Sequence, residues 1–163
     1  MQHIYIRILA ALLCTGLNSL PAHACDTAGQ AAVTRNPGDT DARYELARSC
    51  AAAGRHQEAL AQYDILLARD ANNSDWLLGK AQSLIALQRP AEALPFLEHG
   101  RSVAPSYEDI WRTNATALEM LQDYERGDAL LADAQRAFPQ SAWPAAKRAA
   151  LAEQRLLRRG TRI

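Results

Sequence analysis

The stretch that decides the fold is residues 74–107, SDWLLGKAQSLIALQRPAEALPFLEHGRSVAPSY. Apolar and small residues recur in it at helical spacing, first Leu77, Ala81, Leu84 and Ile85, and then Ala93, Leu94 and Leu97. Gln88-Arg89-Pro90 interrupts the two runs. Pro90 suits the first turn of a helix because its missing N–H is not needed there. The stretch therefore predicts a helix, a turn and a second helix.

The same pattern recurs on both sides at an interval of 34 residues. Three columns keep this interval: Pro37, Ala71, Pro105 and Pro139; Ala47, Ala81 and Ala115; and Ala59, Ala93 and Gly127. In the preceding unit Gly54 separates the two helices, and glycine suits a helix end because it accepts a left-handed conformation. In the following unit Ser106, three residues before Asp109, predicts a helix cap. The common register predicts stacked helix pairs.

These residues resemble the tetratricopeptide repeat family over residues 40–141. Trp111 occupies the Trp column of the family pattern, Tyr63 replaces its Phe, and Pro105 and Pro139 close their units. Some positions depart from the pattern: Arg43 and Leu77 stand in the Trp column, and Lys80 and Asn114 stand where Leu is usual. The resemblance implies an all-α, right-handed α-solenoid of three helix pairs, with repeats at about 40–73, 74–107 and 108–141.

Both ends extend this repeat domain, which we place at residues 25–141. Pro37 lies one period before Ala71, so residues 26–36 should form the second helix of an incomplete unit. Residues 142–163 should form a C-terminal capping helix and a basic tail. We expect its inner stripe to contain Trp143, Ala146, Ala149, Ala150 and Leu156. We expect its outer face to carry Lys147, Arg148, Arg155, Arg158 and Arg159.

Charge is distributed unevenly along the chain. Its 18 basic and 18 acidic residues cancel, so no overall charge favours nucleic acid or a membrane surface. Residues 142–163, however, hold six basic residues and one acidic residue. Such a run is typical of a solvated face. The functional alternative is contact between the tail and an anionic envelope surface or an acidic partner.

Residues 1–24 have the layout of a secretory signal peptide. Arg7 precedes a short apolar run, and Ala22-His23-Ala24 closes the segment with small residues. The run is shorter than the roughly 20 residues that span a bilayer. We predict cleavage after Ala24, a periplasmic or secreted protein, and no transmembrane segment in the mature chain. The alternative is an uncleaved anchor or a plain N-terminal helix.

Two cysteines, Cys25 and Cys50, remain after such a cleavage. A pair of cysteines in an exported chain predicts a disulfide. Here it would fasten the N-terminal helix to the first repeat. Lipidation of Cys25 is an alternative, although Ala22 stands where the bacterial lipidation signal favours Leu. An intermolecular bond is another alternative. No third Cys and no His stands beside the pair at ligand spacing, so we predict no metal site.

No pattern typical of an enzyme is present. The sequence has no Gly-rich phosphate loop, no HExxH and no GxSxG. His56 and His99 fall near helix ends and are expected to be exposed or packed side chains. We predict no catalytic residue and no cofactor.

The resemblance implies that the first helices of the pairs line a concave groove. At the positions that face it, the predicted partner-binding residues are Tyr44, Arg48, Asp75, Leu78, Gln82, Ile85, Arg112, Thr116 and Glu119, with Asp41, Asp109 and Met120 at equivalent positions. Arg48 and Arg112 are expected to pair with acidic groups of the partner. The recurring Asp41, Asp75 and Asp109 also suit helix starts without any ligand, because a helix dipole stabilises negative charge there.

The sequence therefore predicts a periplasmic scaffold that binds a protein or peptide of the cell envelope. By analogy with the fold, it would serve a secretion, polysaccharide-export or assembly system. The alternatives are a periplasmic assembly chaperone that holds unfolded clients, and a lipid-anchored accessory of an envelope enzyme.

Overall fold

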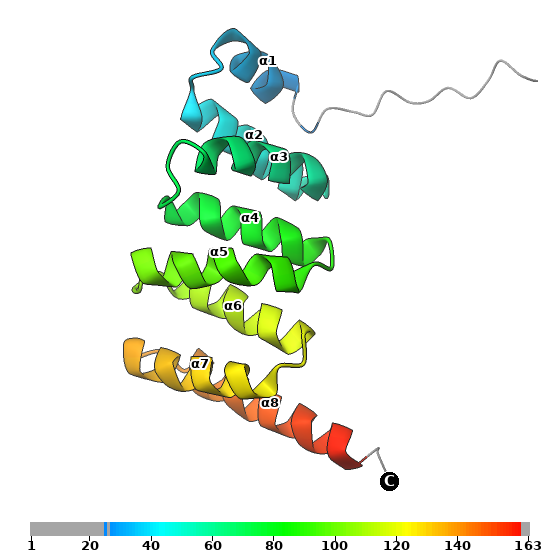
Figure 1. The fold of residues 1–163 in the computed structure, drawn as a ribbon, viewed down its shortest axis with the longest axis vertical. Helices are drawn as coiled ribbons and strands as arrows, with labels where there is room; N and C mark the ends of the chain where they lie inside the picture. Colours follow the sequence, from blue (N-terminus) through cyan, green and yellow to red (C-terminus); the bar gives the residue numbers. More distant parts are fainter. Residues whose placement is uncertain (1–24, 26, 161–163) are drawn as a thin grey trace, which may run out of the picture.

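The computed structural model describes residue 25 and residues 27–160, which form eight α-helices and no strand within these ranges. The helices are α1 (Thr27–Arg35), α2 (Thr40–Ala52), α3 (His56–Leu67), α4 (Ser74–Ala86), α5 (Pro90–Val103), α6 (Glu108–Met120), α7 (Tyr124–Ala137) and α8 (Trp143–Gly160). They stack in chain order from α1 at one end to α8 at the other (Figure 1). None of the described helices is long and apolar enough to cross a membrane.

Each helix packs mainly on its neighbours in the chain, and the first helices α4 and α6 also contact each other. The pairs α2–α3, α4–α5 and α6–α7 fall within the three predicted repeats. Ala47, Ala81 and Ala115, one small-residue column, have no exposed surface. Small side chains at these positions let paired helices approach closely, and this is why the 34-residue register is visible in the sequence.

The turn between the helices of each pair has the same backbone form. Gly54, Gln88 and Gln122, one period apart, have φ angles of 75°, 59° and 60°. In each turn the backbone N–H of the following residue donates to a carbonyl of the preceding helix. Arg55 N donates to Cys50 O at 2.8 Å, and Arg89 N donates to Leu84 O at 2.9 Å. This left-handed helix end is confirmed at Gly54. The two glutamines adopt it too, although their side chains make it less favourable.

Two first helices are capped by side chains and one is not. Asp39 accepts from Ala42 N at 2.9 Å, and Asn73 accepts from Trp76 N at 3.2 Å. The predicted Ser106 cap is wrong, because α6 begins at Glu108 and Tyr107 precedes it without a side-chain hydrogen bond. The helix therefore starts one residue later than the capping pattern requires.

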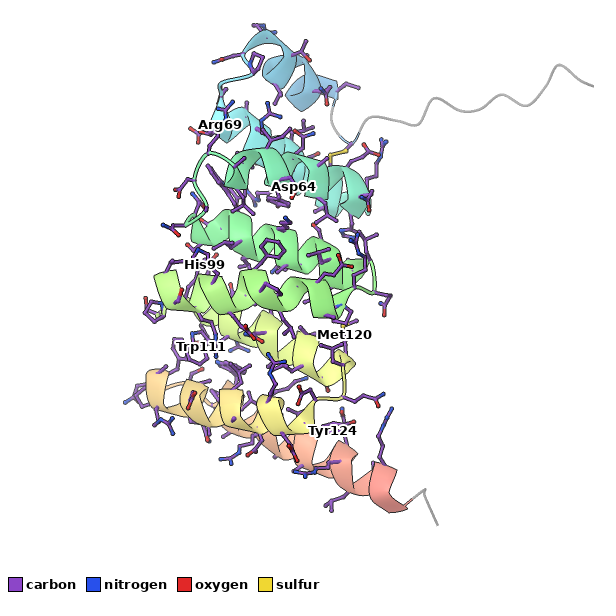
Figure 2. The ribbon with its side chains drawn as sticks, viewed as in Figure 1. Asp64, Arg69, His99, Trp111, Met120 and Tyr124 are labelled. Atoms are coloured by element: carbon purple, nitrogen blue, oxygen red, sulfur yellow. A yellow bond between two sulfur atoms is a disulfide. The ribbon has the colours of Figure 1, made fainter. Side chains whose placement is uncertain are left out.

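Two of the three residues in the Trp column, Trp111 and Arg43, make the same hydrogen bond with different side chains. Trp111 Nε1 donates to Pro105 O at 2.9 Å, and Arg43 Nη2 donates to the equivalent Pro37 O at 3.1 Å. Arg43 is buried, with 7% of its surface exposed. Trp111 lies near the N-terminal end of α6 and Met120 at the other end (Figure 2). A polar side chain thus replaces the family residue while it keeps the same hydrogen bond.

The Leu column departs from the family pattern at two positions. Lys80 Nζ lies 2.5 Å from Asp64 Oδ1 and 4.0 Å from the centre of the Phe96 ring. Asn114 is 2% exposed, and its Oδ1 has no hydrogen-bond partner. The stack therefore accommodates both polar residues, the first through an ion pair and the second at the cost of an unpaired acceptor.

The orientation of α8 differs from the prediction. Its buried residues are Pro144 and Leu151, whereas Ala146, Ala149 and Ala150 are exposed and Leu156 is 67% exposed. The predicted inner stripe is therefore wrong at these four exposed residues, whereas Trp143 is half-buried and packs against the core as predicted. The alanines offer little apolar area, while the long stems of basic side chains can cover apolar surface and still place their charges beside acids.

Three basic residues predicted to lie on the outer face of α8 point at the preceding pair. Lys147 pairs with Glu119, Arg148 Nε lies 2.5 Å from Asp128 Oδ1, and Arg155 lies 3.8 Å from Glu125. The basic character of this helix thus serves its own docking on α6 and α7.

Candidate functional site

The candidate site is the surface that we call the first-helix face, made by the outward side chains of α2, α4, α6 and α8. The predicted partner-binding residues all lie on α2, α4 and α6. Arg48, Asp75, Gln82 and Arg112 are exposed, and Tyr44, Ile85, Thr116 and Glu119 are half-buried. The opposite surface, which we call the second-helix face, is made by α3, α5 and α7.

Leu78 is not available as predicted. It is only 7% exposed and belongs to the same buried cluster as Leu84 and Leu118. Ile85 packs against this cluster and stays half-buried. A polar residue at Leu78 would therefore disturb the core before it disturbed binding.

The charged residues of the first-helix face are paired within the chain. Arg48 Nη1 lies 3.1 Å from Glu45 Oε1, and Arg112 Nε donates to Glu108 Oε1 at 2.8 Å. Glu119 accepts from Lys147 and, at 2.8 Å, from Gln154 Nε2. The arginines expected to meet acidic groups of a partner thus already have acidic neighbours.

A pocket of about 410 Å³ lies at the C-terminal end of this face. It is lined by Arg112, Thr116, Trp143, Ala146, Lys147 and Ala150. The Arg112 guanidinium lies 4.7 Å from the centre of the Trp143 ring and forms one wall with it. Sequence reasoning missed Trp143, Ala146 and Ala150 as site residues. They stand one period after Asp109, Arg112 and Thr116, so extending the register by one unit would have found them.

A tyrosine–aspartate group lies where α4 and α6 begin. Tyr107 Oη donates to Asp75 Oδ1 at 2.9 Å. Burial, this hydrogen bond and the negative charges of Asp75 and Asp109 raise the pKa of Tyr107 to about 12. Burial and the charge of Asp75 also raise the pKa of Tyr44. Tyr107 was not predicted, since it lies just outside the helix that it precedes.

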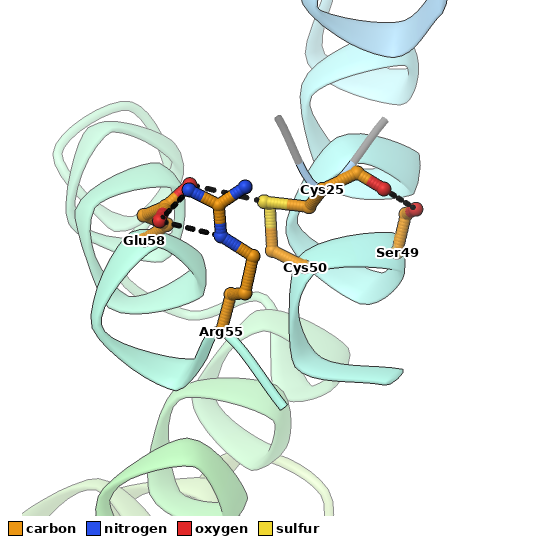
Figure 3. The surroundings of a disulfide bond; sticks show 5 residues. All are labelled: Cys25, Ser49, Cys50, Arg55 and Glu58. Atoms are coloured by element: carbon orange, nitrogen blue, oxygen red, sulfur yellow. Dashed lines mark hydrogen bonds and ion pairs between the residues drawn. A yellow bond between two sulfur atoms is a disulfide. The ribbon is translucent and has the colours of Figure 1, made fainter. Parts of the chain in front are cut away.

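A disulfide joins Cys25 and Cys50, whose Cα atoms are 4.5 Å apart (Figure 3). Ser49 Oγ donates to Cys25 O at 3.2 Å, and Glu58 Oε2 lies 3.2 Å from Cys25 Sγ. Cys25 stands one period before Ala59, in the column of small residues that pack against the following first helix. At Cys25 the disulfide to α2 takes the place of that packing contact. Within the described ranges, Cys25, Cys50 and Glu58 are the one group whose possible ligand atoms lie close enough to hold a metal ion, and the disulfide joins both of its sulfur atoms.

The two described histidines lie on different helices. His56 begins α3, and its Nδ1 is buried without a hydrogen-bond partner. His99 lies on α5, and its Nε2 is 2.9 Å from Asn72 Oδ1. The hydrogen-bond partner of His99 Nε2 is thus an amide oxygen, which is neutral and does not activate an imidazole as a carboxylate does.

Comparison with known proteins identifies the fold. The tetratricopeptide repeat family model matches residues 28–83, which run from α1 into α4. A thermophilic TPR protein of Thermus thermophilus, TTC0263, has 22% identity and a TM-score of 0.61, with 76% of this chain and 69% of that chain covered. Residues 28–83 thus match the tetratricopeptide repeat family, and the chain has the tetratricopeptide repeat fold.

Other tetratricopeptide repeat structures have the same fold. MamA 41-end from Desulfovibrio magneticus RS-1 has 18% identity and a TM-score of 0.64, with 77% of this chain and 76% of that chain covered. The first TPR of Spaghetti (RPAP3), solved bound to the HSP90 peptide SRMEEVD, has 16% identity and a TM-score of 0.64. That match covers 71% of this chain and 91% of the other. No curated protein matches the chain significantly.

Proposed function

We propose that this protein is a non-catalytic scaffold that binds a protein or peptide segment on its first-helix face. The observation that carries the proposal is the continuity of this face into α8. Arg112 and Thr116 of the last repeat and Ala146 and Ala150 of α8 stand in the same repeat positions and line one pocket. A surface that continues across several units suits an extended or helical segment better than a small molecule. The peptide-bound RPAP3 domain supports this assignment.

We further propose that the protein acts in the cell envelope after export. The signal-like pattern lies in residues 1–24, outside the described residues, so this proposal depends on the sequence pattern and on the disulfide. Disulfides persist mainly in oxidising compartments such as the periplasm. While the bond is intact, the Cys25 sulfur is not available for lipidation. An envelope assembly, secretion or polysaccharide-export system would supply the partner.

The test is partner capture with a bulky residue placed on one face at a time. Gln82 on α4 and Gln57 on α3 are both exposed glutamines, on the first-helix and second-helix faces respectively. Gln82→Trp should reduce capture of a native partner at least fivefold, whereas Gln57→Trp should leave it unchanged. The reverse order would place the binding site on the second-helix face. Suppressed aggregation of several unrelated clients, without a stable partner, would favour the chaperone alternative.

A further inference from the structure

The net charge of the first-helix face follows from its internal ion pairs. Its basic residues Arg48, Arg112 and Lys147 each lie beside an acid of the same face, namely Glu45, Glu108 and Glu119. These three pairs are close to neutral when seen by a partner. The preference of the face is therefore set by the charged groups that remain.

On α2, α4 and α6 three carboxylates remain, those of Asp41, Asp75 and Asp109, and Glu153 adds a further exposed carboxylate on α8. The three aspartates are exposed, and no described basic residue forms an ion pair with any of them. They stand one period apart, in the first turns of α2, α4 and α6. The helix dipole favours them at these positions, but its effect falls off within the first turn and does not supply a counter-ion.

Two tyrosine side chains, Tyr107 and Tyr44, lie close enough to these carboxylates to be affected by their charges. The pKa of Tyr107 is raised by burial, by the hydrogen bond to Asp75 and by the charges of Asp75 and Asp109. The pKa of Tyr44, on the neighbouring repeat, is raised by burial and then by Asp75, while Arg48, 5.7 Å from the centre of its ring, acts to lower it. Carboxylates from two repeats thus act together on one region that also presents two aromatic rings, and aromatic faces attract cations.

We propose that the first-helix face selects a cationic partner segment with apolar side chains, its Lys or Arg residues seated against Asp75 and Asp109 between Tyr44 and Tyr107. This inference depends on the proposed function, since it names the class of segment that the same face binds. It reverses the expectation that Arg48 and Arg112 would meet acidic groups. The apolar side chains of the segment pack beside Ile85 and in the pocket with Trp143 and Ala146.

The repeat spacing sets the spacing of the cationic residues. Neighbouring packed helices lie about 10 Å apart. A polyproline II segment has three residues per turn and rises about 3.1 Å per residue, so every third side chain lies on the same side and could meet the next aspartate. The favoured segment is therefore in the polyproline II conformation, with Lys or Arg at every third position and apolar residues between them.

The test compares peptides of opposite charge on the mature protein with its disulfide intact. One probe repeats Lys-Leu-Ser three times, and its counterpart repeats Glu-Leu-Ser. At low salt the lysine peptide should bind at least tenfold more tightly, and the difference should shrink as salt screens the charges. Equal or tighter binding of the glutamate peptide, or no binding of the lysine peptide, would overturn the charge preference.

Two amide substitutions locate the effect. Asp75→Asn with Asp109→Asn removes two negative charges but keeps the acceptor for Tyr107, and should weaken the lysine peptide about fivefold. Glu92→Gln removes a charge from the first turn of α5 on the second-helix face and should change affinity less than twofold. Unchanged affinity in the aspartate variant would also overturn the inference. Native partner capture sensitive to Gln82→Trp would then leave the scaffold function standing, whereas insensitive capture would remove the scaffold function as well.

Discussion

The two ends of the stack are fastened in different ways. At the N-terminal end α1 has nine residues and buries only Val33, and a disulfide joins Cys25, beside this helix, to α2. At the C-terminal end α8 has 18 residues, buries Pro144 and Leu151, and makes ion pairs with α6 and α7. A terminal helix with little apolar area thus depends on a covalent bond. A longer helix can dock by packing and charge.

The attachments of α1 and α8 should respond to different solution conditions. Exposed ion pairs weaken at high salt and at low pH, whereas a disulfide responds only to reduction. The first-helix face runs between these ends and includes α8 but not α1. Docking of α8 therefore matters directly for the binding pocket, while the disulfide acts on the pocket only through the stability of the stack.

The largest expected effect is that of the disulfide. Cys25→Ser should lower the free energy of unfolding of the N-terminal part by about 3 kcal/mol, because the crosslink restricts the unfolded chain. Hydrogen exchange should show that α1 loses protection while α7 and α8 keep theirs. Reduced wild-type protein is the control and should behave like the variant. A loss spread evenly over all the helices would contradict local fastening.

The next effect tests the packing of α8. Leu151 is 3% exposed, and its Cδ1 would lie 3.3 Å from a Cβ built on Gly127. Leu151→Ala should cost about 2 kcal/mol, the lower end of the range for buried leucine, because the helix lies at the end of the stack. Leu156→Ala on the same helix should cost less than about 0.5 kcal/mol, since Leu156 is 67% exposed. Chemical denaturation of both variants measures the difference. Equal losses would show that the assigned docking face is wrong.

The smallest effect concerns the ion pair of Glu119. Burial acts to raise the pKa of Glu119, but hydrogen bonds from Lys147 and Gln154 outweigh it and lower the pKa. Its stabilisation should therefore be present above the unfolded-state pKa of about 4.3 and be lost as the pH falls through the lower folded-state pKa. Glu119→Gln should cost about 1 kcal/mol or less at neutral pH.

The difference in stability between wild type and Glu119→Gln should shrink as the pH is lowered from 7 to 3. Thermal unfolding at several pH values measures this. A difference that grows toward low pH would mean that the carboxylate of Glu119 is destabilising in the folded state.

Much of the fold could be predicted from small residues in register. Ala47 and Ala59 each belong to a column of small residues that recurs every 34 residues and is buried between helices. These columns therefore predict where the helices pack on each other. The face that α8 buries could not be read in the same way. The alanines of α8 resemble a packing stripe, but the helix instead buries Leu151 and the stems of basic residues. The ion pairs of these basic residues are formed with acids at least 20 residues earlier in the chain.

The 34-residue register predicted which helices carry the candidate site residues, but it did not predict the charge of the face that they form. Register placed Gln82, Ile85 and Thr116 on α4 and α6, where the structure leaves them exposed or half-buried. Sequence alone could not show that Arg48 and Arg112 turn toward acids of their own helices, because this depends on side-chain conformation. The paired arginines are what leave the aspartates to set the charge preference.

The central claim is that the first-helix face contacts the partner. The most direct measurement places a photo-crosslinking residue at Gln82 on α4 or at Gln57 on α3 in the full-length protein in its native cells. Strong crosslinking of one discrete partner from Gln82, with little from Gln57, is the predicted result. Crosslinking from Gln57 alone would contradict the account, because it would place the partner on the second-helix face.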